Sequence, residues 1–122
     1  MSKILIIEDS ALSRRMLREI LESAGHDVVD AHDGISGLER YFLEKPDLVT
    51  LDLTMKYMHG LDVLARLREM DPTAKVVIAS ADIQNTTHAM VKEAGAAGFI
   101  GKPFVAEAVL EKIAATLKGS KS

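Results

Sequence analysis

Short apolar runs alternate along the chain with longer segments in which apolar residues return at helical spacing. The runs cover residues 4–7, 28–31, 48–51, 76–79 and, more weakly, 98–100. They are nearly continuous rather than alternating with polar residues, which is typical of strands covered on both faces. The pattern therefore predicts five buried strands.

The segments between and after the runs predict five helices, each with one apolar stripe. The first helix is expected to end at Gly25, the second before Pro46, and the last to cover residues 106–117. The expected stripes, in chain order, are Leu12, Met16, Leu17, Ile20 and Leu21; Leu38, Tyr41 and Phe42; Leu61, Leu64 and Leu67; Ile83, Met90, Val91 and Ala94; and Val109, Leu110 and Ile113.

Five consecutive strand–helix units predict an α/β fold with a doubly wound, five-stranded parallel sheet and helices on both faces. Ligands bind such sheets beyond the carboxyl ends of the strands, at the point where the strand order reverses. The residues that directly follow each run are therefore the candidates for chemistry.

Composition excludes several kinds of site. The 122 residues are 48% apolar and 27% charged, as in soluble globular domains, and we expect one domain over residues 1–118 and a disordered polar tail at 119–122. The net charge of −3 argues against direct contact with nucleic acid. The chain has no cysteine for disulfides or thiolate metal sites. No apolar stretch reaches about 18 residues, so we expect a cytoplasmic protein without membrane insertion.

Polar residues with complementary chemistry follow four of the runs. Glu8 and Asp9 come after the first run, Asp52 after the third, Ser80 after the fourth and Lys102 after the fifth. Neighbouring carboxylates repel one another and resist burial, but they become favourable ligands when they share a hard divalent cation. Mg²⁺ suits such a site, with Mn²⁺ as a substitute, because it takes carboxylates and leaves positions for phosphate oxygens.

The same residues suit phosphoryl transfer. A phosphoryl group in transfer carries negative charge on three oxygens, which a cation, the Lys102 amine and the Ser80 hydroxyl could meet. Asp52 could attack phosphorus and form an acyl phosphate. The sequence thus predicts Asp52 as a phosphoryl acceptor.

Four segments carry a resemblance to a known family: "ILIIEDS", "DLVTLDLTM" continuing to "HG", "VIASA" and "AGAAGFIGKPF". They resemble the acid pair, the phosphorylation segment, the small hydroxyl residue and the lysine–proline segment of the receiver domain of bacterial response regulators, the CheY-like family. The resemblance runs from about residue 3 to residue 117 and implies the flavodoxin-like strand order 2-1-3-4-5.

The resemblance implies a role for each residue of the phosphorylation site. Asp52 would be the phosphoacceptor, and Lys102 and Ser80 would be its catalytic partners. Ser80 and Phe99 would form the switch pair that responds to phosphorylation. The Lys102–Pro103 peptide bond is implied to be cis.

The resemblance also implies a metal site. Mg²⁺ would be bound directly by Asp9, Asp52 and the backbone carbonyl of Thr54, and by Glu8 through water. Thr54 and Asp82 would tune the lifetime of the phosphoryl group, because they lie where side chains could admit or block the attacking water.

The implied function is that of a single-domain response regulator. It would accept a phosphoryl group from a histidine kinase or a phosphotransfer protein. Phosphorylation would change the face formed by the fourth helix, fifth strand and fifth helix, and so control a downstream protein in chemotaxis-type or phosphorelay signalling. Such a domain is not an ordinary enzyme, because it catalyses only its own phosphorylation and dephosphorylation.

In the segment that follows Asp52, two residues depart from the family pattern. Lys56 follows Met55 where the family usually has proline, and His59 stands before Gly60 where an acid or amide is common. Lys56 removes a φ constraint and adds an amide donor and a charge near the site. We therefore expect altered loop rigidity and an altered phosphorylation lifetime.

Three other functions remain open. A receiver-type fold could act as an interaction module without phosphorylation. A phosphatase of the haloacid-dehalogenase type also uses a strand-end aspartate with Mg²⁺, but Thr54 replaces its second acid and the chain has no room for a substrate cap. A flavodoxin-like cofactor binder needs a phosphate-binding loop, whereas "EDSALSRR" is acidic and has no glycine.

The first predicted helix carries three bases, Arg14, Arg15 and Arg18. They could form a basic surface on which the histidine-bearing helix of a kinase docks. The alternative is an ordinary solvated helix face.

Overall fold

The five apolar runs form the strands of one parallel sheet. The computed structural model describes residues 2–55, 58–81 and 84–119. Within these ranges the strands are β1 (Lys3–Ile7), β2 (Asp27–Ala31), β3 (Leu48–Asp52), β4 (Val76–Ser80) and β5 (Gly98–Gly101). Their order in the sheet is β2-β1-β3-β4-β5, which confirms the predicted doubly wound topology. Residues 120–122 of the expected tail lie outside the described residues.

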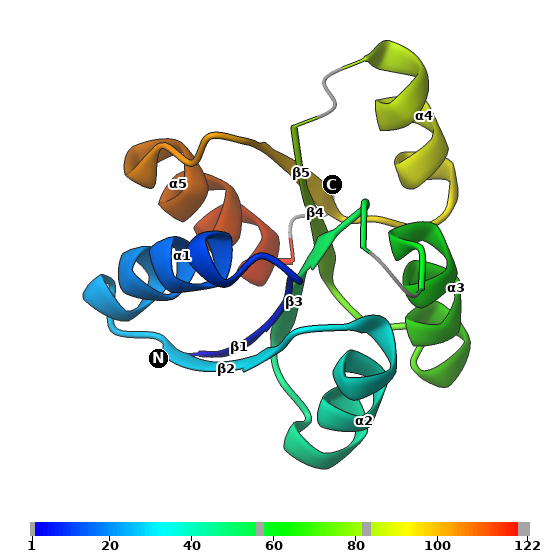
Figure 1. Ribbon diagram of the computed structural model, residues 1–122, viewed down its shortest axis with the longest axis horizontal. Coiled ribbons are helices and arrows are strands. Elements are labelled where there is room, and N and C mark those ends of the chain that lie inside the picture. The colour runs from blue at the N-terminus through cyan, green and yellow to red at the C-terminus, as the bar shows by residue number, and fades with distance from the viewer. Residues whose placement is uncertain (1, 56–57, 82–83, 120–122) are drawn as a thin grey trace.

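Helices cover both faces of this sheet. In the described ranges they are α1 (Ala11–Ser23), α2 (Gly34–Glu44), α3 (Gly60–Met70), α4 (Asn85–Glu93) and α5 (Ala106–Leu117). Figure 1 shows α1 and α5 on one face, and α2, α3 and α4 on the other. The first helix ends just before Gly25, whose φ of 89° suits glycine, and the second ends just before Pro46, as predicted. No helix among the described residues is long and apolar enough to cross a membrane.

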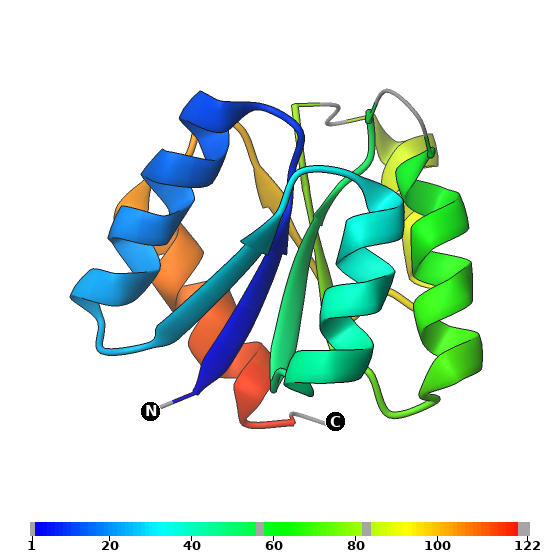
Figure 2. The same ribbon diagram turned by 60° about the horizontal axis from the view of Figure 1, so that its bottom comes forward.

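The strand order reverses between β1 and β3. These strands pair directly, although β2 lies between them in the chain. The chain leaves β1 toward α1 on one face and leaves β3 toward α3 on the other, so the two loops diverge at this point, where ligands bind in sheets of this kind. Figure 2 shows the loops that follow β1 and β3 at the same end of the sheet.

Two apolar layers separate the sheet from its helices. Side chains of a strand point alternately to the two faces. Leu5 and Leu51 therefore pack with residues of α2 and α3, whereas Ile4 and Val77 pack with residues of α1 and α5. β3 and β4 are buried at every position, as predicted for strands covered on both faces, while the edge strand β2 is only partly buried.

Several residues predicted to line the inner helix stripes instead face solvent. Phe42 is 68% exposed, Leu12 is 62% exposed and Met90 is 51% exposed. A helix lying on a sheet buries only the narrow stripe beneath its axis, so apolar residues beside that stripe reach solvent. The stripe predictions are therefore wrong at Leu12, Met16, Phe42, Met90 and Ala94. Ile83, also predicted for a stripe, lies outside the described residues.

The buried stripe of α2 runs through glycines. Its buried residues are Gly34, Gly37 and Tyr41. A Cβ atom at Gly37 would lie 2.5 Å from Cδ1 of Ile7, so the helix approaches β1 more closely than a side chain would permit. Apolar periodicity cannot detect a stripe made largely of glycine, and it therefore wrongly predicts that Phe42 faces the core.

Thr50, in the middle of β3, offers a test of the core. It is 1% exposed and its Oγ1 has no hydrogen-bond partner among the described residues. Thr50→Val should raise the free energy of unfolding by about 1 kcal/mol, because it removes a buried hydroxyl that makes no hydrogen bond and keeps the side-chain shape. Thermal or urea unfolding measures the change.

The matched control is Thr116→Val in α5. Thr116 is also buried, but its Oγ1 donates to the carbonyl oxygen of Lys112 at 2.8 Å. This variant should gain less stability than Thr50→Val, because it loses a hydrogen bond. A Thr50→Val variant that is no more stable than the native protein would contradict the prediction.

Candidate functional site

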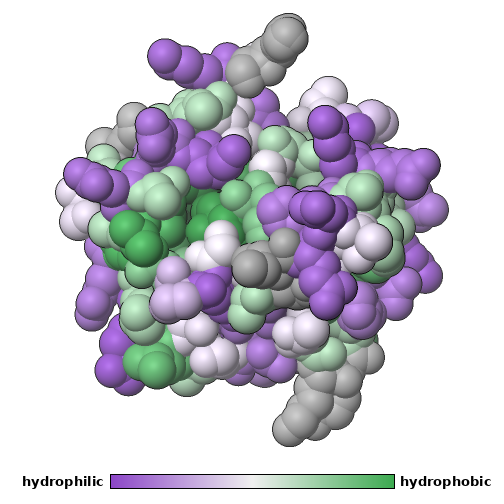
Figure 3. Space-filling view, turned by 90° about the horizontal axis from the view of Figure 1, so that it is seen from above, coloured by the Kyte–Doolittle hydropathy of each residue, from purple (hydrophilic) through white to green (hydrophobic). Residues whose placement is uncertain are grey.

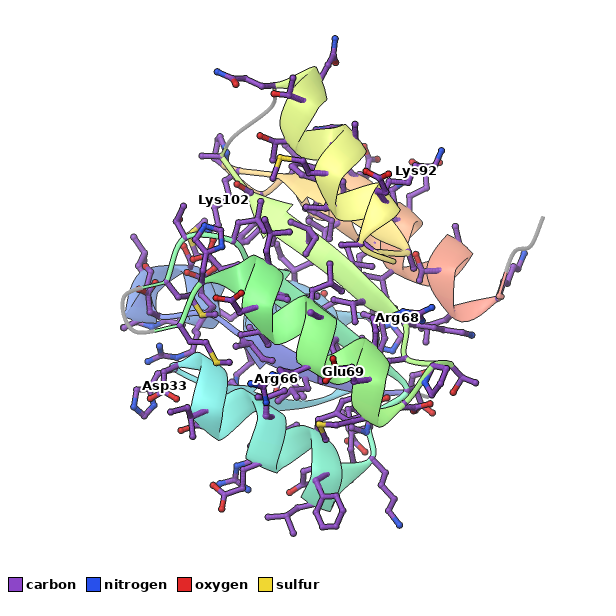
Figure 4. All side chains as sticks on the ribbon, turned by 90° about the vertical axis from the view of Figure 1, so that its right-hand side faces the viewer. Asp33, Arg66, Arg68, Glu69, Lys92 and Lys102 are labelled. Carbon is purple, nitrogen blue, oxygen red and sulfur yellow. The ribbon has the colours of Figure 1, made fainter. Side chains whose placement is uncertain are left out.

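Four adjacent strands bring the predicted polar residues to one edge of the sheet. Asp52 and Ser80 are the last residues of β3 and β4, while Glu8 and Lys102 directly follow β1 and β5. The backbone N–H of Lys102 donates to the carbonyl of Ser80 at 3.0 Å, so β5 stays beside β4 up to the site. Figure 4 shows Lys102 near this end of the sheet and Arg68 at the opposite end.

Glu8, Asp9 and Asp52 form an acidic cluster. One carboxylate oxygen from each residue lies within 4.8 Å of the others. Glu8 is 2% exposed and Asp52 is 3% exposed, whereas Asp9 is exposed to solvent. Two of the three acids are thus removed from water while they face a third.

Lys102 partly compensates this cluster. Its Nζ lies 2.9 Å from Oε1 of Glu8 and 3.6 Å from Oδ1 of Asp52. The contact with Glu8 is a close ion pair, whereas the contact with Asp52 is longer. One cation against three carboxylates leaves an excess of negative charge at the edge of the sheet.

The electrostatic cost appears at Asp52. Burial of its carboxyl group, together with the charge of Glu8, raises the pKa of Asp52 from 3.8 to about 6. Lys102 acts in the opposite direction, as does a hydrogen bond from the backbone of Thr54. Since burial and the neighbouring acids prevail, a further cation would stabilise the charged form.

The residues of the cluster fit a magnesium ion. Mg²⁺ binds carboxylate and carbonyl oxygens and retains several waters. The cluster supplies carboxylate oxygens that already lie close together, and one of them, Oε1 of Glu8, is buried with the Lys102 amine as its charged neighbour. The exposed Asp9 leaves one side of the cluster in contact with solvent, from which waters and a phosphoryl group can approach.

Phe99, the predicted switch aromatic, lies on β5 beside a histidine that the sequence did not indicate. Phe99 is partly buried against the core, and its ring centroid is 3.8 Å from that of His88 in α4, with 31° between the ring planes. The apolar pattern of α4 carries no signal for this contact, because His88 is an exposed polar residue. The pairing depends on how α4 lies against β5.

The remaining predicted residues lie in loops beside the site. Thr54 is exposed two residues after Asp52, and the Lys102–Pro103 peptide bond is cis. Asp82 and Lys56 lie outside the described residues. The roles predicted for them in phosphorylation lifetime and loop rigidity therefore stay predictions.

A glycine fixes the start of α3 against the end of β3. A Cβ atom at Gly60 would lie 2.4 Å from the backbone oxygen of Asp52 and 2.6 Å from Cα of Leu53, and the Gly60 N–H donates to the Leu53 carbonyl at 2.9 Å. His59 is the N-cap of the helix, since its Nδ1 accepts a hydrogen bond from the N–H of Leu61 at 3.2 Å. The close approach of Gly60 to Asp52 and Leu53 holds in place the end of β3, which carries Asp52.

Comparisons with known proteins agree with this geometry. A family profile described as the response regulator receiver domain matches residues 4–114. The chain is 40% identical to the chemotaxis protein CheY of Bacillus subtilis over 116 residues, which cover 94% of this chain and 97% of that protein. It is 38% identical to CheY of Thermotoga maritima over 112 residues, or 91% and 93% of the two chains. A chain in the crystal structure of the CheX–CheY–BeF3–Mg²⁺ complex from Borrelia burgdorferi matches with a TM-score of 0.91 and 31% identity, over 98% of this chain and 90% of that chain.

Replacement of Gly60 tests how closely the start of α3 packs against the end of β3. Gly60→Ala should lower the free energy of unfolding by about 1–3 kcal/mol, because the new methyl group meets backbone atoms that cannot rotate away. Gly101→Ala at the end of β5 is the control, since a Cβ atom there has nothing within 4 Å. Equal melting temperatures for the two variants would refute the close approach.

The acidic cluster should make the stability of the metal-free protein depend on pH. The pKa of Asp52 is higher in the folded protein, about 6 against 3.8, so protonation favours the folded state. The contribution of Asp52 to the free energy of unfolding therefore falls as pH rises from about 4 to 6 and stays low above that. Asp52→Asn should thus be more stable than the native protein near pH 7, by about 1–2 kcal/mol after allowance for solvent screening.

The measurement is chemical unfolding of both proteins at several pH values, with and without Mg²⁺. The advantage of Asp52→Asn should shrink toward about pH 5. Mg²⁺ should also reduce it, because the ion stabilises only the protein that keeps the full cluster. An advantage that is constant across this range would show that Asp52 does not titrate as described.

Proposed function

The chain belongs to the response regulator receiver domain family, and we propose that it is a phosphorylated response regulator receiver with Asp52 as its phosphoacceptor. The observation that carries this proposal is the position of Asp52. It ends the central strand, is 3% exposed, and lies 3.6 Å from Lys102 within an acidic cluster. Burial of a carboxylate beside two others costs stability, so a chemical role accounts for its place better than a structural one.

In the proposed reaction, a carboxylate oxygen of Asp52 attacks the phosphorus of a phosphohistidine on the donor protein. The P–O bond forms as the P–N bond breaks, and the imidazole nitrogen keeps the electron pair. A histidine kinase or a phosphotransfer protein would supply the donor. β3, which is buried at every position, holds the nucleophile still during this step.

Charge on the phosphoryl oxygens has to be neutralised during transfer. Mg²⁺ would supply part of the positive charge, with Mn²⁺ as a substitute, and we assign Asp9, Asp52 and the Thr54 carbonyl as direct ligands. Glu8 would act through water. Lys102 would turn its amine from the carboxylates toward a phosphoryl oxygen, a short movement given its 3.6 Å distance from Asp52.

Ser80 and Phe99 would carry the signal away from the site. The Ser80 hydroxyl would bond a phosphoryl oxygen, and the Phe99 ring would move into the space that the hydroxyl leaves. The ring of Phe99 packs against that of His88 in α4, so its movement would also shift α4. Phosphorylation would thereby favour one of two packing arrangements.

A groove on the adjacent face suits the downstream partner. Figure 3 looks onto the side formed by α4 and α5, where apolar side chains gather between more polar helix surfaces. The groove has a volume of about 520 Å³, and its lining includes Phe99, Ile100, Pro103, Val105 and Val109. Since Phe99 belongs to both the switch and this groove, phosphorylation could change how a protein binds there.

The relatives support a chemotaxis-type or phosphorelay role. The Borrelia burgdorferi structure holds a CheY together with CheX, BeF3 and Mg²⁺, and we propose a comparable Mg²⁺-dependent, partner-binding form for this chain. Family membership favours the receiver over the phosphatase and the flavodoxin-like cofactor binder. Residues 1–118 would form the receiver and 119–122 a polar tail. An interaction module that is never phosphorylated remains the alternative to be tested.

Phosphorylation of the purified protein tests the proposal. Incubation with acetyl phosphate or phosphoramidate and Mg²⁺ should add the mass of one phosphoryl group, and the adduct should be labile, as an acyl phosphate is. Asp52→Asn should show no gain, because it lacks the nucleophile. Removal of the cation with a chelator should prevent the gain in the native protein.

The control is Asp47→Asn, directly before the first residue of the same strand. Asp47 is exposed and its Oδ2 accepts a hydrogen bond from the Lys3 N–H at 2.8 Å, a contact that an asparagine can keep. This variant should be phosphorylated like the native protein. A folded native protein that gains no phosphoryl group from any donor would support the interaction module instead.

A further inference from the structure

Arg14, in the first turns of α1, bonds back to the acidic loop. Its Nη1 donates to the backbone carbonyl oxygen of Glu8 at 2.8 Å. That carbonyl lies just beyond the end of β1, so a side chain rather than a neighbouring strand supplies its hydrogen bond. The contact closes the short link from β1 to α1, which contains Glu8, Asp9 and Ser10.

The three bases of α1 have different surroundings. Arg18 forms ion pairs with Glu22 at 2.9 Å and with Asp30 at 3.0 Å, whereas Arg15 is exposed. The three arginines are therefore not equivalent, and whether a kinase docks on this face stays a prediction. The place of Arg14 is set by the loop that it contacts.

Glu8 is held at several points, and Asp9 depends on it. The Glu8 N–H donates to the Ala31 carbonyl at 3.1 Å, and its Oε2 accepts from the Ser10 N–H at 3.2 Å. The peptide group between Glu8 and Asp9 is planar, so a bond that orients the Glu8 carbonyl also orients the amide of Asp9. Asp9 is the exposed acid of the cluster, so its own packing does little to fix its direction.

We propose that Arg14 is a positioning residue for the cation site. Its hydrogen bond orients the Glu8–Asp9 peptide and so keeps the Asp9 carboxylate within reach of the other two acids. This inference rests on the proposed Mg²⁺ site. Because Arg14 bonds to a backbone carbonyl, its loss should change the geometry of the loop as well as remove one positive charge.

Binding of Mg²⁺ alone to the metal-free protein tests this role without any kinase or phosphoryl donor. Arg14→Met should weaken Mg²⁺ binding about tenfold, as loss of a partner that orients a metal ligand commonly does. It should also speed hydrogen exchange at the Ser10 amide. Arg14→Lys retains a donor and a charge and should bind Mg²⁺ within about threefold of the native protein.

Arg15→Met is the matched control, because it removes the same charge from the next position of the helix. It should leave both Mg²⁺ affinity and exchange at Ser10 close to native. Equal weakening in Arg14→Met and Arg15→Met would overturn the proposal, since charge alone would explain it, and so would native affinity in Arg14→Met. Melting temperatures identify any unfolded variant. If Arg14→Met is unfolded, Arg14→Gln takes its place, because its side chain is uncharged and too short to reach the Glu8 carbonyl, and native Mg²⁺ affinity in that variant would overturn the proposal.

The test also separates this inference from the proposed function. A native protein that fails to bind Mg²⁺ overturns both the cation site and the role of Arg14. A native protein that binds Mg²⁺, with Arg14→Met binding equally well, overturns the role of Arg14 and leaves the cation site intact.

Discussion

The mutual repulsion of buried carboxylates is the constraint on which this site depends. Glu8 and Asp52 are almost fully removed from water and face each other and Asp9, with Lys102 as their nearby cation. The raised pKa of Asp52 records the remaining cost. The fold accepts this cost at one edge of the sheet, and a divalent cation of the kind proposed above would relieve the repulsion there.

A rigid frame keeps the repelling groups from moving apart. β3 is buried along its whole length, and α3 begins so close to its end that Gly60 leaves no room for a side chain. On the other side, the loop after β1 is tied by the backbone and the carboxylate of Glu8 and by the side chain of Arg14. Packing and hydrogen bonds around the site thus hold the acids where electrostatics alone would not.

The helix α4, which lies beside β5, is far less tightly packed than the elements that hold the acidic cluster. Among the residues of α4, Val91 is the one that is buried, and the helix meets β5 through the contact of His88 with Phe99. An element with so few buried contacts can shift at small cost. A stiff site beside a weakly held helix is a suitable arrangement for a switch, because a local change in charge can then move the helix without disturbing the sheet.

The sequence by itself determined the five strands, the class of fold and the set of polar residues at the strand ends, because apolar periodicity is local and the rules for parallel sheets are general. It could not determine which apolar residues of each helix are buried, the glycine contacts of Gly37 and Gly60, or the partners of Arg14 and His88. These depend on the depth and rotation at which each helix lies on the sheet. That placement is set by close contacts between segments distant in the chain, and only the tertiary structure contains them.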